Sequence, residues 1–210
     1  MKTKTFVLHA AFLLIICSGF AQNKKPIAAI SAGISSAYYS TDDDNSNSSD
    51  FMTGVSAGFS LRFPTSPHWA INPGLFFVQK GGVETFENIK FTTTLNYVEV
   101  PVNIYYSKRN RFFWGFGPSF ALGLSGKIKA ESESVKINFG SNSEDDLKRF
   151  EAGLNLMSGF RFQNNLFIEI NLNSTYNNLS NDDESKFFNN YLGIRLGYFF
   201  PNKIKEQKSK

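Results

Sequence analysis

Apolar and polar side chains alternate along most of the chain after its first 25 residues. The stretch "NYVEVPVNIYY" (Asn96–Tyr106) shows this well: valines, an isoleucine and a tyrosine fill one set of alternate positions, whereas the other set includes Glu99 and Pro101. A period of two is typical of a β-strand, because successive side chains point to opposite faces of a sheet. A carboxylate and a proline are unusual in a central strand of a soluble sheet. The pattern therefore predicts strands with one strongly apolar face and an opposite face that carries polar and charged residues.

Eight stretches with this period follow one another along the chain, each about 10 to 16 residues long. They are Pro26–Ser40, Phe51–Phe63, His68–Lys80, Phe91–Ser107, Arg111–Lys127, Leu147–Phe162, Leu166–Ser180 and Phe187–Phe200. Strands of soluble domains are most often about five or six residues long. A tilted strand needs about 9 to 11 residues to cross a membrane. All eight predicted strands reach that length.

The connections between the predicted strands alternate strictly between long and short. The short ones are Pro64–Pro67, Lys108–Asn110 and Gln163–Asn165, and the long ones are Thr41–Asp50, Gly81–Lys90, Ile128–Asp146 and Asn181–Lys186. Outer-membrane barrels combine short periplasmic turns with longer external loops on an even number of strands. We therefore expect an all-β fold, namely an eight-stranded antiparallel up-and-down transmembrane β-barrel with both chain ends periplasmic.

The chemistry of the two faces supports a membrane barrel over a soluble exported β-domain or a ligand carrier. The apolar rows are bulky and the opposite rows are small, polar or charged, as where Phe112, Trp114 and Phe116 alternate with Gly115 and Gly117. The interior of an eight-stranded barrel is too narrow for eight bulky rows. The bulky rows are therefore expected to face lipid, and the small and polar rows to fill the lumen.

Some residues add detail to this barrel or do not fit it cleanly. Aromatic residues near strand ends are expected to form interfacial girdles; they are Tyr38, Tyr39, Trp69, Tyr105, Tyr106, Trp114, Tyr198 and Phe199. Ile27 and Phe76 fall on inner rows, and the sequence offers no explanation beyond local packing or a bulge. Because Pro101 cannot donate a ladder hydrogen bond, we expect a bulge or an irregular rung there.

Six charged residues fall on the inner rows and form the candidate site, a polar lumen network. They are Arg62, Glu99, Glu151, Arg161, Glu169 and Arg195. One interpretation is an ion path. The favoured interpretation is structural, because a narrow interior that excludes bulk water forces opposite charges to pair. We expect Glu99 and Glu169 to pair with lumen arginines, with Arg195 as the partner of Glu169 on the adjacent strand.

The first residues, "MKTKTFVLHAAFLLIICSGFAQ", predict an export signal. Two lysines precede a short apolar run, and Gly19 and Ala21 are the small residues of a cleavage site. We expect residues 1–21 to be a signal peptide cleaved after Ala21, residues 22–200 the barrel, and residues 201–210 a basic periplasmic tail. A retained membrane anchor and lipoprotein processing at Cys17 are the alternatives, the latter disfavoured because Ile16 stands where a small residue is needed.

Composition and motifs argue against nucleic-acid binding, catalysis and specific metal binding. Removal of Lys2 and Lys4 leaves 20 basic against 18 acidic residues, a near balance that predicts no nucleic-acid partner. Loss of Cys17 leaves no thiol, so Cys–His zinc sites are excluded. His68, the one remaining histidine, lies beside a short turn, and we expect no catalytic role for it. The loop containing Asp42, Asp43, Asp44, Asn45 and Asp50 lacks the spacing of a calcium loop, and we expect a solvated surface loop that can touch surface glycans.

Four stretches resemble one known family. They are "YVEVPVNIYY" (Tyr97–Tyr106), "GFGPSFALGLSGK" (Gly115–Lys127), "FEAGLNLMSGFRF" (Phe150–Phe162) and "NNYLGIRLGYFF" (Asn189–Phe200). They are similar to the PorT-like outer membrane β-barrel family of Bacteroidota, and the ending "FAQ" of the predicted signal is typical of that phylum. The resemblance implies an outer-membrane location. One branch of the family is associated with type IX protein secretion, and nothing in this sequence selects that branch.

The expected function is non-enzymatic: a structural, adhesive or partner-binding outer-membrane protein, without cofactor or metal. The expected partners are outer-membrane lipid and either envelope proteins or surface glycans, and the barrel is expected to be monomeric. The connection Ile128–Asp146 is the best candidate for specific contact because it is the longest. The alternatives are an accessory component of a type IX-like secretion or assembly complex and a narrow passive pore. The narrow interior of an eight-stranded barrel argues against the pore.

Overall fold

The computed structural model describes residues 25–41, 48–108, 111–131, 133–140, 145–181 and 185–200. No helix in these ranges is long and apolar enough to cross a membrane. The eight main strands are β1 (Ile27–Thr41), β2 (Met52–Pro64), β3 (Trp69–Phe86), β4 (Ile89–Lys108), β5 (Phe112–Ala130), β9 (Phe150–Arg161), β10 (Leu166–Thr175) and β11 (Phe187–Phe199). Three short strands, β6 (Glu133–Ile137), β7 (Phe139–Gly140) and β8 (Leu147–Lys148), lie between β5 and β9.

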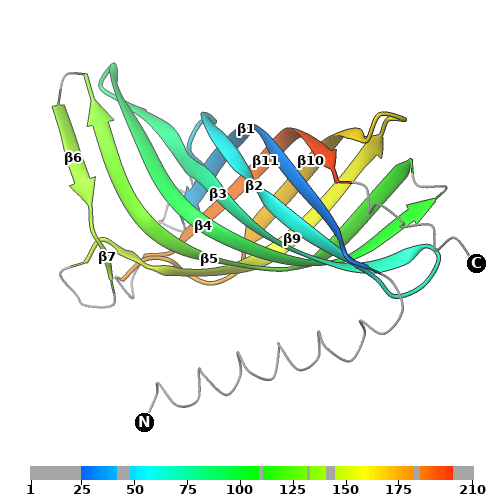
Figure 1. Ribbon diagram of the computed structural model, residues 1–210. Coiled ribbons are helices and arrows are strands. Elements are labelled where there is room, and N and C mark those ends of the chain that lie inside the picture. Colours follow the sequence, from blue (N-terminus) through cyan, green and yellow to red (C-terminus); the bar gives the residue numbers. More distant parts are fainter. Residues whose placement is uncertain are drawn as a thin grey trace, which may run out of the picture.

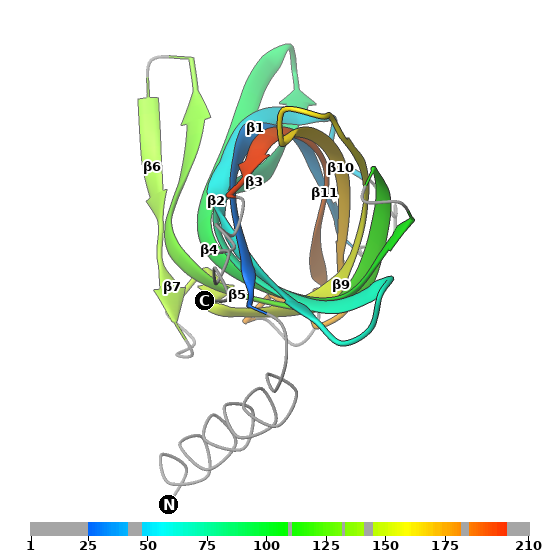
Figure 2. The same cartoon turned by 45° about the vertical axis from the view of Figure 1, so that its right-hand side comes forward.

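The eight main strands form a closed antiparallel ring. Each pairs with its neighbour in the chain, β5 pairs with β9, and the ring closes where Ala29–Thr41 of β1 pairs with Phe187–Phe199 of β11. Figure 2 shows the ring, with β6 outside it. Closure gives the backbone groups of both end strands a partner, which a hydrocarbon environment requires. The predicted eight-stranded antiparallel up-and-down barrel is confirmed.

The ring is much taller on one side than on the other. β3, β4 and β5 have 18, 20 and 19 residues, whereas β9, β10 and β11 have 12, 10 and 13. The first part of β5, Phe112–Leu122, pairs with β9, and its last part, Gly126–Ala130, pairs with β6. Residues 81–96, 124–131 and 133–137 therefore extend beyond the rest of the ring as a projecting wall (Figure 1). We call this the long-loop end of the barrel and the opposite end the short-turn end.

Two segments that were predicted to be loops contain strands of the projecting wall. The segment Gly81–Lys90 is not a loop, because β3 and β4 stay paired up to a two-residue turn at Glu87 and Asn88, both with positive φ. Gly81 resembles a turn residue in the sequence, but it lies inside β3 with φ 139°, where an added Cβ would come within 2.0 Å of the Thr93 carbonyl oxygen. The predicted loop Ile128–Asp146 likewise contains the end of β5 and the strands β6 and β7.

The seventh predicted strand is too long, because β10 ends at Thr175 rather than at Ser180. The side chain of Asn177 takes the place of the next backbone partner of β9: its Oδ1 accepts from the Ala152 N–H at 2.7 Å, and its Nδ2 donates to the Phe150 carbonyl at 3.0 Å. The amide side chain thus provides hydrogen-bond partners for the backbone groups at the edge of β9. The chain is therefore free to leave the sheet and turn across the mouth of the barrel.

Exposure follows the predicted rows on the outside of the barrel. The apolar row of β4 is partly or fully exposed, whereas the alternate row, from Tyr97 to Tyr105, is buried. On the outer face of the barrel at its short-turn end, an aromatic cluster is formed by Trp69, Tyr106 and Trp114. Their ring centroids are 5.0 to 5.8 Å apart, as expected for a girdle. The girdle prediction is wrong for three residues, because their positions are on inward rows; they are Tyr39, Tyr105 and Phe199, which are 6%, 2% and 4% exposed.

The small inner residues make room for large inner rings, which the alternating sequence pattern alone does not predict. Three buried phenylalanines each lie directly opposite a glycine on the neighbouring strand. The pairs are Phe76–Gly58, Phe113–Gly159 and Phe167–Gly197. Phe76 packs with Ala37, Val78 and Tyr191, and Ile27 packs against a second buried cluster. These contacts explain why both apolar residues lie on inner rows.

The sheet is irregular near Pro101. β3 pairs with β4 up to Pro73 opposite Val102, and pairing resumes only at Phe76 opposite Glu99, so Pro101 has no rung on the β3 side. The irregular rung is therefore present. The register shift between β4 and β5 lies elsewhere, between Asn96 and Tyr97.

The glycine–phenylalanine pairs predict a position-specific cost of one methyl group. A Cβ on Gly197 would come within 2.2 Å of Phe167 Cζ, whereas a Cβ on Gly193, four residues earlier on the same row, meets nothing closer than 3.5 Å. We expect Gly197→Ala to lower the free energy of unfolding by about 1–3 kcal/mol through overpacking. Gly193→Ala is the matched control and is expected to be neutral or slightly stabilising. Urea unfolding in lipid vesicles measures both, and equal stability of the two variants contradicts the packing role.

Candidate functional site

The short-turn end of the lumen is closed by aromatic rings under two arginines. The buried cluster there consists of Ala29, Ala70, Tyr105, Phe113, Met157, Phe167 and Phe199. The Arg62 guanidinium lies 3.7 Å from the ring centre of Tyr105 and 4.3 Å from that of Phe199. Arg161 lies 5.2 Å from the same Phe199 ring and donates to the Asn165 side chain. These cation–π contacts give the buried Arg62 charge an attractive environment.

A buried ion pair forms the next layer. Arg195 donates to Glu169 Oε1 from both Nη2, at 2.6 Å, and Nε, at 3.1 Å. The pair joins adjacent strands, because Glu169 of β10 is directly opposite Arg195 of β11. The guanidinium also stacks 4.1 Å from the Phe76 ring centre. A cavity beside this pair has a volume of about 10 Å³, which is at the lower limit for a single water molecule.

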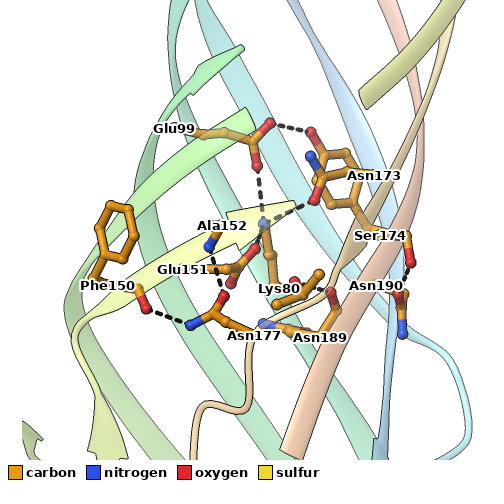
Figure 3. A network of polar contacts seen from close by, with 12 residues as sticks. Lys80, Glu99, Phe150, Glu151, Ala152, Asn173, Ser174, Asn177, Asn189 and Asn190 are labelled. Atoms are coloured by element: carbon orange, nitrogen blue, oxygen red, sulfur yellow. Dashed lines mark hydrogen bonds and ion pairs between the residues drawn. The ribbon is translucent and has the colours of Figure 1, made fainter. Parts of the chain in front are cut away.

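The centre of the lumen holds a buried lysine between two carboxylates (Figure 3). The ammonium group of Lys80 lies 2.9 Å from Glu99 Oε2 and also pairs with Glu151 Oε1. The three residues are 0%, 1% and 2% exposed and come from β3, β4 and β9. Glu99 also accepts a hydrogen bond of 2.8 Å from the Tyr191 hydroxyl of β11. The cluster therefore ties together four strands around the ring.

The long-loop end is closed by side chains that fold in over Tyr97. Phe139, which follows β6, packs against the Tyr97 ring with centroids 5.7 Å apart. Leu147 and Leu179 complete this buried cluster and are 8% and 0% exposed. The backbone holds these segments in place: Lys148 N–H donates to the Leu179 carbonyl at 2.7 Å. Apolar layers thus lie at both ends of the lumen, with the charged groups between them.

The predicted lumen residues all lie on inner rows. Five are buried and Arg161 is half-buried. Glu169 pairs with Arg195, but the prediction that Glu99 pairs with an arginine is wrong, because its partner is Lys80. Lys80 was missed because it ended the predicted third strand, next to two glycines that resembled a turn. Its position on the same alternate row as Phe76 was the signal that could have placed it inside the barrel.

The other candidate residues show no assembled reactive site. His68 Nδ1 lies 3.3 Å from the Ser107 carbonyl at the short-turn end. Among the residues that the structure describes, no group of three or more His, Cys, Asp and Glu side chains is arranged to hold a metal ion. Four of the five loop residues considered for calcium, Asp42, Asp43, Asp44 and Asn45, lie outside the described residues, as do residues 1–21 and 201–210.

A family model and the structure of Neisserial surface protein A agree with the barrel fold. The sequence matches the model of a family described as "Outer membrane protein beta-barrel domain" over residues 20–181. Neisserial surface protein A has a similar structure, with a TM-score of 0.52 and 10% sequence identity over 84% of this chain and 100% of that one. The attachment invasion locus protein Ail of Yersinia pestis aligns with a TM-score of 0.43 and 14% identity over 83% of this chain and 100% of Ail. No curated protein sequence matches the chain.

The lysine cluster predicts a large loss of stability when only its cation is removed. Lys80→Met leaves two buried carboxylates without their cation, and we expect the free energy of unfolding to fall by about 3–5 kcal/mol. The triple variant Lys80→Met, Glu99→Gln, Glu151→Gln removes all three charges and is expected to regain most of that loss. Urea unfolding followed by tryptophan fluorescence measures both. A single variant as stable as the wild type, or a triple variant no better than the single one, contradicts the structural role of the cluster.

Proposed function

The chain belongs to the outer membrane protein beta-barrel domain family, and from this premise we propose that it is a non-conducting, non-enzymatic barrel that binds partners at the cell surface through its projecting wall. Its location in the outer membrane follows from the family and the fold. The proposal adds the absence of conduction, the absence of catalysis and the binding surface.

The observation that carries the proposal is the filling of the lumen. Rings and aliphatic side chains occupy both ends, and the charged residues between them are engaged with one another or with rings. A hydrated ion needs a continuous polar passage, whereas these apolar layers lie across the axis at two levels. The charges are held by pairing, which favours a structural role for the network over an ion path. The passive pore is therefore not the favoured function.

With the lumen filled and the sides facing lipid, the projecting wall is the largest surface outside the ring that the described part of the chain offers to partners. It carries exposed apolar residues in both of its hairpins, Phe86 beside the β3–β4 turn at 67% exposure and Val135 of β6 at 66%. In each hairpin the exposed residue lies directly opposite a second exposed apolar residue, Ile89 for Phe86 and Ile128 for Val135, and grouped apolar side chains of this kind mark a contact surface better than single ones. Part of the predicted contact segment Ile128–Asp146 belongs to this wall, which supports a binding role for that segment.

The subfamily, the export signal and the C-terminal tail are also proposals. The four stretches that resemble the PorT-like family of Bacteroidota support that branch, and with it the alternative of an accessory component in a type IX-like secretion or assembly complex. Copurification with a multi-protein envelope complex would favour this accessory role over independent surface binding. The export signal of residues 1–21, with cleavage after Ala21, and the basic periplasmic tail of residues 201–210 rest on the sequence pattern alone.

A filled lumen predicts no electrical conductance. We expect the purified barrel to produce no current steps in a planar lipid bilayer, because apolar layers obstruct the axis at both ends. A porin reconstituted in the same bilayer is the positive control. Reproducible single-channel steps from the wild-type chain, which scale with the amount of barrel inserted, would overturn the proposal and restore the pore.

The orientation has its own test. We expect an epitope tag inserted within Asn45–Ser49 to be accessible to antibody on intact cells, because Thr41 of β1 and Met52 of β2, between which the tag is inserted, lie at the long-loop end, which external loops occupy in outer-membrane barrels. A tag within Pro64–Pro67, at the short-turn end, is expected to be accessible only after the outer membrane is permeabilised. The reverse labelling pattern would place the projecting wall in the periplasm.

A further inference from the structure

The hairpin of β5 and β6 contains an unfavourable pair of like charges. Lys127 of β5 lies directly opposite Lys136 of β6. Both side chains are exposed, and no carboxylate among the described residues forms an ion pair with either ammonium group. Like charges directly opposite one another destabilise a strand pair. A hairpin that keeps such a rung gains from an anion placed between the two ammonium groups.

A groove of about 650 Å³ contains this rung and a third cation, Arg149. The Arg149 guanidinium is held in place by a hydrogen bond of 2.9 Å from Nη2 to the Phe139 carbonyl. Asp145 also lines the groove, so three positive charges face one negative charge. A guanidinium that is fixed by the backbone is well suited to bind an oxygen-rich anion.

The lysines lie on the face of the wall that continues the lipid-facing row. On β4 the outward row runs from Val98 through Asn96 and Thr94 to Thr92, and the last three are opposite Ser125, Lys127 and Lys129 of β5. The face thus changes from apolar to neutral polar to basic along the strands. This order matches a membrane boundary, where hydrocarbon is followed by polar headgroups.

The depth of the rung also fits lipid phosphate. Lys127 follows Leu124, an outward residue that is 57% exposed, by three positions. Three residues of strand span about 10 Å, or roughly 7–8 Å along the membrane normal for a strand tilted by 35–45°. The headgroup region on each side of the hydrocarbon core is about 5–8 Å thick. Lys127 and Lys136 are therefore placed at the level of the headgroups.

We propose that this groove binds the phosphate-bearing headgroup of an outer-leaflet lipid, with phosphate oxygens between Lys127, Lys136 and Arg149 and acyl chains along the apolar row below. The inference rests on the proposed surface-binding role of the wall and names the chemistry of one ligand. A membrane lipid is favoured over a free sulfated glycan because the basic groove continues directly from the lipid-facing row. The bound anion relieves the repulsion across the rung.

Lipid retention measures this site. The full chain is reconstituted in vesicles that mix phosphatidylcholine with phosphatidic acid, extracted in mild detergent, and analysed by native mass spectrometry for retained lipid. We expect the ratio of retained phosphatidic acid to retained phosphatidylcholine to be about tenfold or more higher for the wild type than for the double variant Lys127→Gln, Lys136→Gln. Each lysine at a membrane surface contributes a substantial attraction to anionic lipid. The variant Lys136→Glu replaces the repulsive rung with an ion pair, so it is expected to fold at least as stably yet lose the preference.

A charge-matched control separates the site from general surface charge. Lys108→Gln with Arg111→Gln removes two exposed cations at the short-turn end and is expected to keep the preference. Equal loss in this control and in the groove variant overturns the proposal, as does an unchanged preference in the groove variant. Equally tight binding of a heparin oligosaccharide in lipid-free detergent overturns the assignment to lipid. None of these results depends on conductance, so failure here is distinguishable from failure of the non-conducting barrel.

Discussion

Closure of the ring is the constraint on which the rest of this structure depends. A bilayer offers backbone groups no hydrogen-bond partner, so β1 must pair with β11, and eight strands then fix a narrow interior. The chain fills that interior by setting large rings against glycines on the next strand, as Phe167 does against Gly197. The bulky outer rows and the small inner rows are both consequences of one geometric requirement.

The same narrow interior explains the arrangement of the buried charges. Lys80 lies between Glu99 and Glu151, and Arg195 lies against Glu169, so the carboxylates of the lumen each have a cation within contact distance. Arg62 instead lies over aromatic rings. In a low-dielectric interior a charge without such a partner is costly. The network therefore holds strands from opposite sides of the ring in register, and nothing in its geometry assembles a nucleophile with a base or an oxyanion site.

The sequence predicted the strands and their outward faces because alternation reports directly which side chains share a face. It did not predict where the strands end, since Gly81 has the composition of a turn but the role of a close approach between strands, and Asn177 ends β10 through its side chain. The partners within the lumen were also beyond its reach, because pairing across the ring depends on register. Glu169 and Arg195 are on adjacent strands in the chain, whereas Lys80 and Glu151 are 71 positions apart.

The unequal height of the ring has a consequence for how this protein sits among its neighbours. Within the membrane the barrel is a closed ring whose outward rows are apolar on every side. Beyond the membrane, β3–β6 rise on one side only, which gives the molecule a front and a back. Anything that meets the rim from the side of β9–β11 finds an open approach over short strands, and anything that meets it from the other side finds a tall sheet. The protein therefore presents different surfaces to neighbours on its two sides in the plane of the membrane.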